Sequence, residues 1–256
     1  MPRSPSARAC LAVLATLPLA LQPARAAVFD EFEVHGTDIA QPGTPTTDLF
    51  LNYGLRGLRH ADFHGGLAND RAFYVSPLLG YGMASWWETA VVLPMAVSRA
   101  GSYSAGGGKS HNVLVLPHAP DAPLTFGAVV ELSALSRRFQ PMTFGWEVRP
   151  LAQWRHGPWT LHLTFGFTGG IGRGQTLLAP AASLYRAVTE MLALGLEHYA
   201  ELGTAARPQP PARQAHQLFV VGQAALGPVM LNLGLGRGLT DASDRWVVKA
   251  HLAWLY

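Results

Sequence analysis

After residue 26 the sequence lacks any uninterrupted apolar stretch of the ~18 residues that a membrane-spanning helix needs. The chain is nevertheless 49% hydrophobic and only 14% charged. A soluble protein of this composition would be expected to show strong core helices or long buried strands. Here many short segments alternate between apolar and polar residues instead, which predicts β-strands. In lipid such strands have to close into a barrel, because an open sheet edge leaves backbone groups unpaired.

Cysteine and an excess of charge are also missing beyond residue 26. The only cysteine is Cys10, so the rest of the chain has no disulfide and no thiolate chemistry. The first 26 residues carry three arginines and no acid, so Lys+Arg falls from 19 to 16 and equals the 16 acidic residues. Without a basic patch, nucleic acid is not an expected partner.

The N-terminus has the order of features of a secretory signal peptide. Two arginines among the first eight residues supply a basic start, and a predominantly apolar run covers 9–21. Ala24-Arg25-Ala26 then has the A-x-A form that signal peptidase cleaves, and the apolar run is too short to stay as a membrane helix. We therefore expect residues 1–26 to be a cleaved leader and the protein to reach the bacterial outer membrane.

Alternation is clearest at the end of the chain. From Trp246 to Tyr256 one face is wholly apolar or aromatic, and the other carries Lys249 and His251. A strand with lipid on one side and a wet lumen on the other needs this pattern. The aromatic end of the outward row, Trp254 and Tyr256, resembles the C-terminal signal of barrels delivered to the outer-membrane assembly machinery. That machinery and outer-membrane lipids are therefore the expected partners.

The same period of two predicts an all-β fold, a closed antiparallel barrel of twelve strands, with ten or fourteen as alternatives. Connectors alternate between short and mostly longer, as in barrels with short periplasmic turns and longer outer loops. A thirteenth strand-like stretch would break the parity, so residues 27–44 are interpreted as a periplasmic or lumen-inserted segment and 45–256 as the barrel. Residues 188–201 also fit an amphipathic helix. The predicted strands cover 47–55, 72–82, 86–97, 110–118, 124–134, 143–151, 158–168, 176–186, 191–201, 214–224, 228–237 and 246–256.

Five prolines fall inside predicted strands. A closed barrel has no free edge, and proline cannot donate a ladder hydrogen bond, so some of these prolines must lie at strand ends or bulges. They are Pro77, Pro94, Pro117, Pro150 and Pro180.

Three short motifs stand at the ends of predicted strands: Tyr81-Gly82, Trp87-Glu88 and Leu93-Pro94. They resemble the pattern of a proteobacterial family of outer-membrane barrels labelled by association with the meta pathway of phenol degradation, while Met83-Ala84-Ser85 departs from that family's usual turn. The stretches 31–43, 216–229 and 236–256 are also similar. The resemblance implies a barrel and, loosely, transport of small molecules.

The predicted inward rows collect polar and ionisable side chains, as the lumen of a channel requires. Their mixed signs favour weak charge selectivity, although opposite charges could instead pair across a narrow interior and plug it. Three functions therefore stay open: a narrow channel or carrier for small solutes that needs no cofactor, a closed structural or interaction barrel, and a lipid-modifying hydrolase. The lumen-lining candidates are Glu88, Glu131, Glu147, Arg149, His162, Glu197, Lys249 and His251, and Asp48, Asn52 and Asn112 are assigned to the same rows.

Patterns for catalysis and metal binding are weak. A hydrolase needs a serine and a histidine within hydrogen-bond reach, but Ser110 and His111 are neighbours that a strand would point to opposite faces, and no G-x-S-x-G elbow is present. His60 and His64 have the i, i+4 spacing that binds zinc on a helix, yet Gly65-Gly66 predicts a loop there. We therefore expect a protein that is not an enzyme, with no catalytic, cofactor or metal residues.

Overall fold

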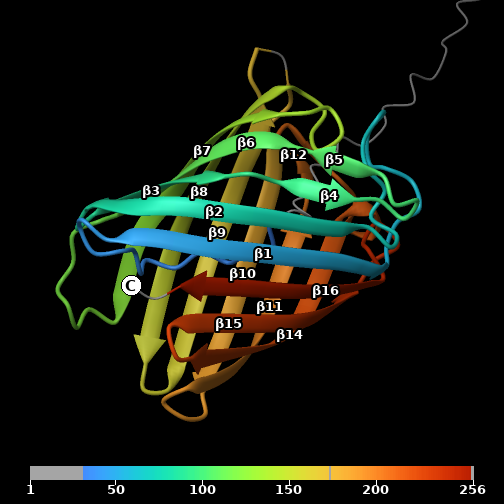
Figure 1. The fold of residues 1–256 in the computed structure, drawn as a ribbon. Coiled ribbons are helices and arrows are strands. Elements are labelled where there is room, and N and C mark those ends of the chain that lie inside the picture. Colours follow the sequence, from blue (N-terminus) through green and yellow to red (C-terminus); the bar gives the residue numbers. More distant parts are fainter. Residues whose placement is uncertain (1–30, 173, 255–256) are drawn as a thin grey trace, which may run out of the picture.

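The structure is a computed structural model that describes residues 31–172 and 174–254, so the expected leader at 1–26 and Tyr256 lie outside the described residues. Twelve antiparallel strands form a single closed sheet in which β1 pairs with both β2 and β16 (Figure 1). Two of the twelve are interrupted, so that β3 and β4 form one strand and β5 and β6 form the next. The barrel strands are β1 (Pro45–Arg56), β2 (Phe73–Ala84), β3 (Trp87–Val92), β4 (Met95–Val97), β5 (Tyr103–Ala105), β6 (Gly107–Val115), β7 (Leu124–Leu135), β8 (Phe144–His156), β9 (Trp159–Gly170), β10 (Leu177–Ala187), β11 (Leu192–Glu201), β14 (Ala215–Leu226), β15 (Val229–Gly238) and β16 (Trp246–Trp254).

The predicted all-β barrel of twelve strands is confirmed, and the alternatives of ten and fourteen strands are wrong. Residues 192–201 form a strand rather than the alternative helix, because β11 pairs along its length with β10 and β14. Two strands differ most from the prediction: β8 continues to His156 where the prediction stopped at 151, and the strand of β5 and β6 begins at Tyr103 where the prediction began at 110. Within the described residues, no helix is long and apolar enough to cross a membrane.

Connector length separates the two rims of the barrel. The short-turn rim carries the connectors 85–86, 116–123, 157–158, 188–191 and 227–228 and the end of β16, near the label C in Figure 1. The long-loop rim carries 57–72, 98–102, 136–143, 171–176, 202–214 and 239–245, mostly longer. One of these loops contains the hairpin of β12 (Gly203–Thr204) and β13 (Arg207–Pro208) and the 3-10 turn Pro211–Arg213. Five tryptophans flank short turns or the end of β16, as in the aromatic girdle of an outer-membrane barrel; they are Trp86, Trp87, Trp154, Trp159 and Trp254.

The barrel is apolar outside and polar inside, the reverse of a soluble protein. Outward positions leave large aliphatic side chains exposed, such as Leu194 at 53% and Val220 at 67%. Inward positions bury charged ones, such as Glu131 at 3% and Lys249 at 2%. Strands that separate an apolar solvent from a polar interior produce this distribution.

Each of the five prolines lies where the ladder is interrupted. Pro94 separates β3 from β4 and Pro117 follows the end of β6. Pro77 faces that same β3–β4 break, and its carbonyl accepts a hydrogen bond from Leu93 N. Pro150 lies at a gap in the β8–β9 register, and Pro180 lies just before the β10–β11 pairing begins. The prolines therefore cost no ladder hydrogen bond to a paired neighbour.

Candidate functional site in the barrel interior

Residues 31–42, here called the inner segment, run along the inside of the barrel from its long-loop half to its short-turn rim. At one end Oε1 of Glu31 lies 2.9 Å from Nζ of Lys109, near the start of β6. At the other end the chain turns into β1, where Gly43 N donates to Gly82 O at 2.8 Å. Within the described residues the inner segment takes part in none of the strand pairings. It is therefore attached to the wall by other contacts.

Side chains of the wall bind the middle of the inner segment through its backbone and hydroxyl groups. Thr37 N donates to Oε1 of Gln153 at 2.7 Å, and the hydroxyls of Thr37 and Thr125 lie 2.5 Å apart. Ala40 N donates to a carboxylate oxygen of Glu88 at 2.7 Å. These partners come from β7, β8 and β3, so the segment is held from several strands at once.

Two apolar side chains of the inner segment pack into the wall. The ring of Phe32 contacts Tyr199 and Phe219, with centroid distances of 5.1 and 5.0 Å. Ile39 packs against a buried aliphatic cluster nearer the short-turn rim. That cluster consists of Val113, Val115, Val129 and Leu151. The segment thus has one hydrophobic anchor toward each end.

Both lysines of the sequence hold the start of the inner segment. Lys109 pairs with Glu31, and Nζ of Lys249 donates to the carbonyl of Phe32 at 3.0 Å. Lys249 also donates to the carboxylate of Glu197. Burying an ammonium is costly unless it is paired and hydrogen-bonded, so these contacts explain how both side chains stay inside.

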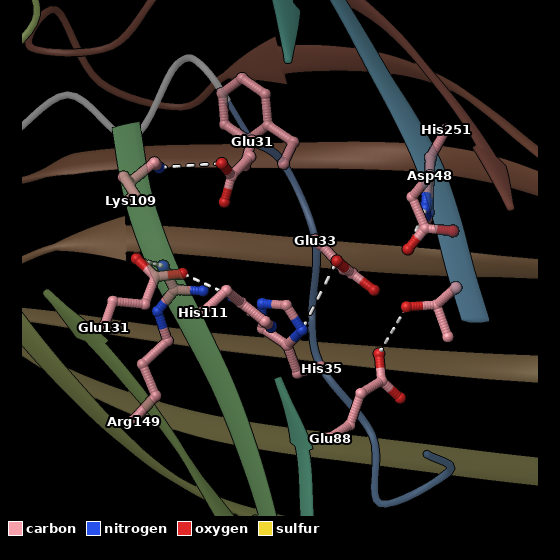
Figure 2. A network of polar contacts seen from close by, with 12 residues as sticks. Glu31, Glu33, His35, Asp48, Glu88, Lys109, His111, Glu131, Arg149 and His251 are labelled. Atoms are coloured by element: carbon pink, nitrogen blue, oxygen red, sulfur yellow. Dashed lines mark hydrogen bonds and ion pairs between the residues drawn. The ribbon is translucent and has the colours of Figure 1, made fainter. Parts of the chain in front are cut away.

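An ionic network occupies the wall opposite the start of the segment (Figure 2). Glu131 and Glu147 face each other across β7 and β8, an arrangement that repels unless cations intervene. Arg149 binds Glu147 through two hydrogen bonds of 2.7 and 3.0 Å and lies 3.7 Å from Glu131. On the other side, Nδ1 of His111 lies 2.7 Å from Oε1 of Glu131. The network thus balances the two facing carboxylates.

The remaining predicted lumen residues have separate partners. Glu197 accepts hydrogen bonds from Tyr185 and Tyr199 in addition to Lys249. Nε2 of His251 lies 3.7 Å from Asp48, and its ring stacks on Phe50. Glu88 accepts a bond from Thr46 as well as from the inner segment. The eight candidates therefore form two connected clusters, around Glu131 and Glu197, with Glu88, His162 and His251 outside them.

The sequence assigned the wrong phase to the strand 107–115. Asn112 was placed inward, but it faces outward, where its Oδ1 accepts bonds from Trp87 and Thr89. The inward row is instead Lys109, His111, Val113 and Val115. Both faces of this strand carry apolar residues, so hydrophobicity alone did not distinguish them. The sequence therefore missed Lys109, His111 and, on the inner segment, Glu31.

Ser110 and His111 do not form a hydrolase-like pair at the long-loop rim. Ser110 and His111 lie on opposite faces of β6, as expected from their adjacency. Ser183 Oγ and His162 Nδ1 do lie 2.8 Å apart, but Ser183 is buried and the pair is in the half of the barrel near the short turns, next to Gly36. A lipid in the leaflet at the long-loop rim does not reach this pair.

A cavity of about 100 Å³ lies between the inner segment and the long loops. Glu31, Phe32 and Glu33 form one side, and Arg149 and Tyr199 belong to the wall side. Loop residues such as Asp62, Asn69 and Ser243 complete the lining. The interior is therefore partly open between the inner segment and the long loops.

Gly36 tests how closely the inner segment fits its wall. A Cβ atom there would collide with Oε1 of Gln153 and come within 3.0 Å of Nε2 of His162. Gln153 is held by Thr37 and Asp38 and cannot turn away without losing those bonds. We expect Gly36→Ala to weaken the docking of the segment by about 1–3 kcal/mol, or roughly 5- to 150-fold in its dissociation equilibrium.

The rate at which an amine reagent modifies Lys109 and Lys249 measures this effect. The matched control is Gly108→Ala, because a Cβ at Gly108 meets nothing closer than 3.7 Å. Equal labelling rates in both variants would contradict a tightly fitted segment.

Comparison with known proteins identifies the fold. No protein-family model matches the sequence, and none of the curated protein sequences is detectably similar to it. A solved outer-membrane channel from Pseudomonas putida F1 is similar with a TM-score of 0.57 and 13% identity, over 88% of this chain and 100% of that one. The NanC porin is similar with a TM-score of 0.51 and 7% identity, over 83% of this chain and 99% of that one. The chain has the fold of outer-membrane barrels.

Proposed function

We propose that the protein is an outer-membrane channel for small solutes, not an enzyme, and that its inner segment closes the channel in the described state. The observation that carries the proposal is the way in which the segment is attached. It contacts strands on several sides of the interior through side-chain hydrogen bonds and shares no ladder with the wall. Displacing it would therefore open a path without breaking the barrel.

The energetics favour a reversible closure. The two hydrogen bonds of Thr37 join neutral groups and contribute about 0.5–1.5 kcal/mol net each, whereas those that involve Glu88, Asp38 or Lys249 include a charged group and contribute about 1.5–3 kcal/mol each. The wall behind the segment is lined by polar residues such as Gln153, Thr125 and Glu88, which would be hydrated once the segment leaves. Phe32 and Ile39 supply the apolar part of the attachment. The closed state is then favoured but not permanent.

The outer surface supports the membrane assignment. Its exposed aliphatic belt and the tryptophans at the short-turn rim suit a bilayer and its interface. The leader-like residues 1–26 and the C-terminal aromatics fit export and recognition by the assembly machinery. The motifs at Tyr81-Gly82, Trp87-Glu88 and Leu93-Pro94 support including the family of the phenol meta-pathway label in the same proposal.

The balance of charge inside predicts weak ion selectivity. Glu131, Glu147 and Glu197 are each within reach of a cation of the wall, either Arg149 or Lys249. Once the inner segment leaves with Glu31 and Glu33, no one sign therefore dominates this part of the wall, and charged rings of one sign are what make a pore selective. The solutes we propose are small and not restricted to one charge.

Single-channel conductance of the refolded mature protein in a planar bilayer tests the proposal. The full mature chain is expected to show rare current steps, and a chain that starts at residue 43 is expected to conduct most of the time. Heat-dependent migration on gels and a β-rich circular dichroism spectrum verify folding of both.

A second readout separates a closed barrel from a misfolded one. In the shortened chain Lys109 and Lys249 lose the contacts that cover them, so amine labelling of both should rise at least tenfold. Rapid labelling without any current would indicate an open interior that does not conduct, which would contradict the channel and favour a structural or interaction barrel.

A further inference from the structure

Four potential metal ligands converge where the start of the inner segment meets the wall. Glu31, His111 and Glu131 each place one ligand atom within 4.8 Å of the other two, and all three residues are buried. The fourth, His35, has its ring centroid 4.9 Å from that of His111 (Figure 2). Ligand atoms around a tetrahedral Zn²⁺ lie about 3.3 Å apart, given bonds of ~2.0–2.1 Å. Small side-chain rotations would therefore bring this set to bonding distance.

His35 is the observation that points to a ligand. Its side chain is only 7% exposed, and its Nε2 has no hydrogen-bond partner among the described residues. A buried nitrogen without a partner is unfavourable unless something binds it. Its other nitrogen, Nδ1, lies 3.5 Å from a carboxylate oxygen of Glu33. A carboxylate behind one imidazole nitrogen is the usual support for a metal on the other.

The charge of the cluster suits a divalent cation. Four carboxylates, from Glu31, Glu33, Glu131 and Glu147, face two permanent cations, Lys109 and Arg149, when both imidazoles are neutral. The net charge of about −2 is what one divalent ion neutralises. Lys109 contacts Oε1 of Glu31 and adds one positive charge beside the set. The cavity lined by Glu31 and Glu33 offers a route from the long loops.

We propose that Glu31 and His35 of the inner segment and His111 and Glu131 of the wall bind one divalent transition metal ion, such as Zn²⁺, and that this ion latches the segment in place. Imidazole and carboxylate ligands together suit Zn²⁺ better than Ca²⁺ or Mg²⁺, which prefer oxygen alone. The site replaces the sequence-based expectation of no metal residues. The latch rests on the proposed channel function, whereas metal binding itself does not.

Titration with Co²⁺, followed by displacement with Zn²⁺, tests the binding step. The probe is the full mature chain, refolded without a polyhistidine tag and freed of metal with a chelator. We expect a visible Co²⁺ absorption band that saturates at one ion per chain and disappears on addition of Zn²⁺. His35→Gln should weaken binding roughly 100-fold or more. We expect this variant to keep the barrel fold, because His35 lies outside the strands.

Two control variants test whether another histidine is the source of the Co²⁺ band. His198 and His216 pair on the outer face with nitrogens 3.2 Å apart, so they are the main competing site. His198→Gln and His162→Gln should both leave the Co²⁺ band unchanged. Loss of the band in His198→Gln, its persistence in His35→Gln, or its absence from the unmodified chain would each overturn the metal site.

Amine labelling and current measurements test whether the bound ion holds the segment in place. With the site intact, Zn²⁺ should slow amine labelling of Lys109 at least tenfold and reduce current steps, and neither effect should occur in His35→Gln. A Co²⁺ band with unchanged labelling would overturn the latch. If no variant conducts current in the bilayer, the proposed channel function is wrong, and the result on metal binding is unaffected.

Discussion

A disulfide between positions 37 and 125 is expected to abolish current through the barrel, and its reduction to restore it. The hydroxyls of Thr37 and Thr125 lie 2.5 Å apart, one on the inner segment and one on β7. A disulfide has an S–S bond of about 2.05 Å, so cysteines at these positions are well placed to form one. Because Cys10 is the only cysteine of the sequence and lies in the expected leader, no other thiol would compete.

The experiment compares the oxidised and reduced Thr37→Cys/Thr125→Cys protein in the same bilayer. Oxidation should also slow amine labelling of Lys109 and Lys249 about 100-fold, because the segment then cannot leave the wall. Thr125→Cys alone, treated with the same oxidant, should behave like the unmodified chain. If current steps continue after mass spectrometry has verified the disulfide, the inner segment is not the element that closes the barrel.

Replacing Lys249 by methionine is expected to reduce the free energy of unfolding by about 3–5 kcal/mol, the usual cost of removing one partner of a buried ion pair. Lys249 is 2% exposed and contacts Glu197, the carbonyl of Phe32 and the hydroxyl of Tyr199. Its removal leaves the Glu197 carboxylate buried with only tyrosine hydroxyls and the amide of Asn232 as partners. Urea unfolding of the protein in lipid vesicles, followed by tryptophan fluorescence, measures the change.

Two further variants distinguish the effect of breaking the buried Lys249–Glu197 pair from the effect of removing any positive charge. Adding Glu197→Gln to Lys249→Met removes the buried carboxylate and should bring the loss below about 2 kcal/mol. Arg237→Met removes an exposed cation that lies 5.6 Å from the ring of Trp246 and should cost no more than about 1 kcal/mol. A single variant at Lys249 that unfolds like Arg237→Met would show that the buried pair contributes little.

The fold could be predicted because barrel strands obey local rules. Each strand alternates between lipid and lumen, so a period of two marks it without knowledge of its neighbours. The pattern in 246–256 and its repetition along the chain predicted twelve strands, and the prolines marked the interruptions. The rule became ambiguous where both faces are apolar. There Asn112 was assigned inward, and only the pairing of β6 with β3 and β7 places Lys109 and His111 inside instead.

The site could be predicted only in part. Alternation indicated that Glu131, Glu147, Arg149, Glu197 and Lys249 belong to inward rows, but it carries no information on which rows lie side by side. Glu197 and Lys249 are 52 positions apart, and strand pairing together with barrel closure brings them into contact. For residues 31–42 no period exists, because the segment pairs with no strand and its partners come from across the barrel.

The alternation of residues along each strand therefore determined the class of fold, the number of strands and the polarity of the two faces. Each of these features depends on the surroundings of single residues and not on contacts between distant ones. The wall partners of Glu31, His35 and Thr37 lie 76 or more positions away in the chain, and closure of the sheet is what brings them to one place. Contacts of this kind depend on the curvature and register of the whole barrel. For that reason the closed interior and the proposed metal latch became visible only in three dimensions.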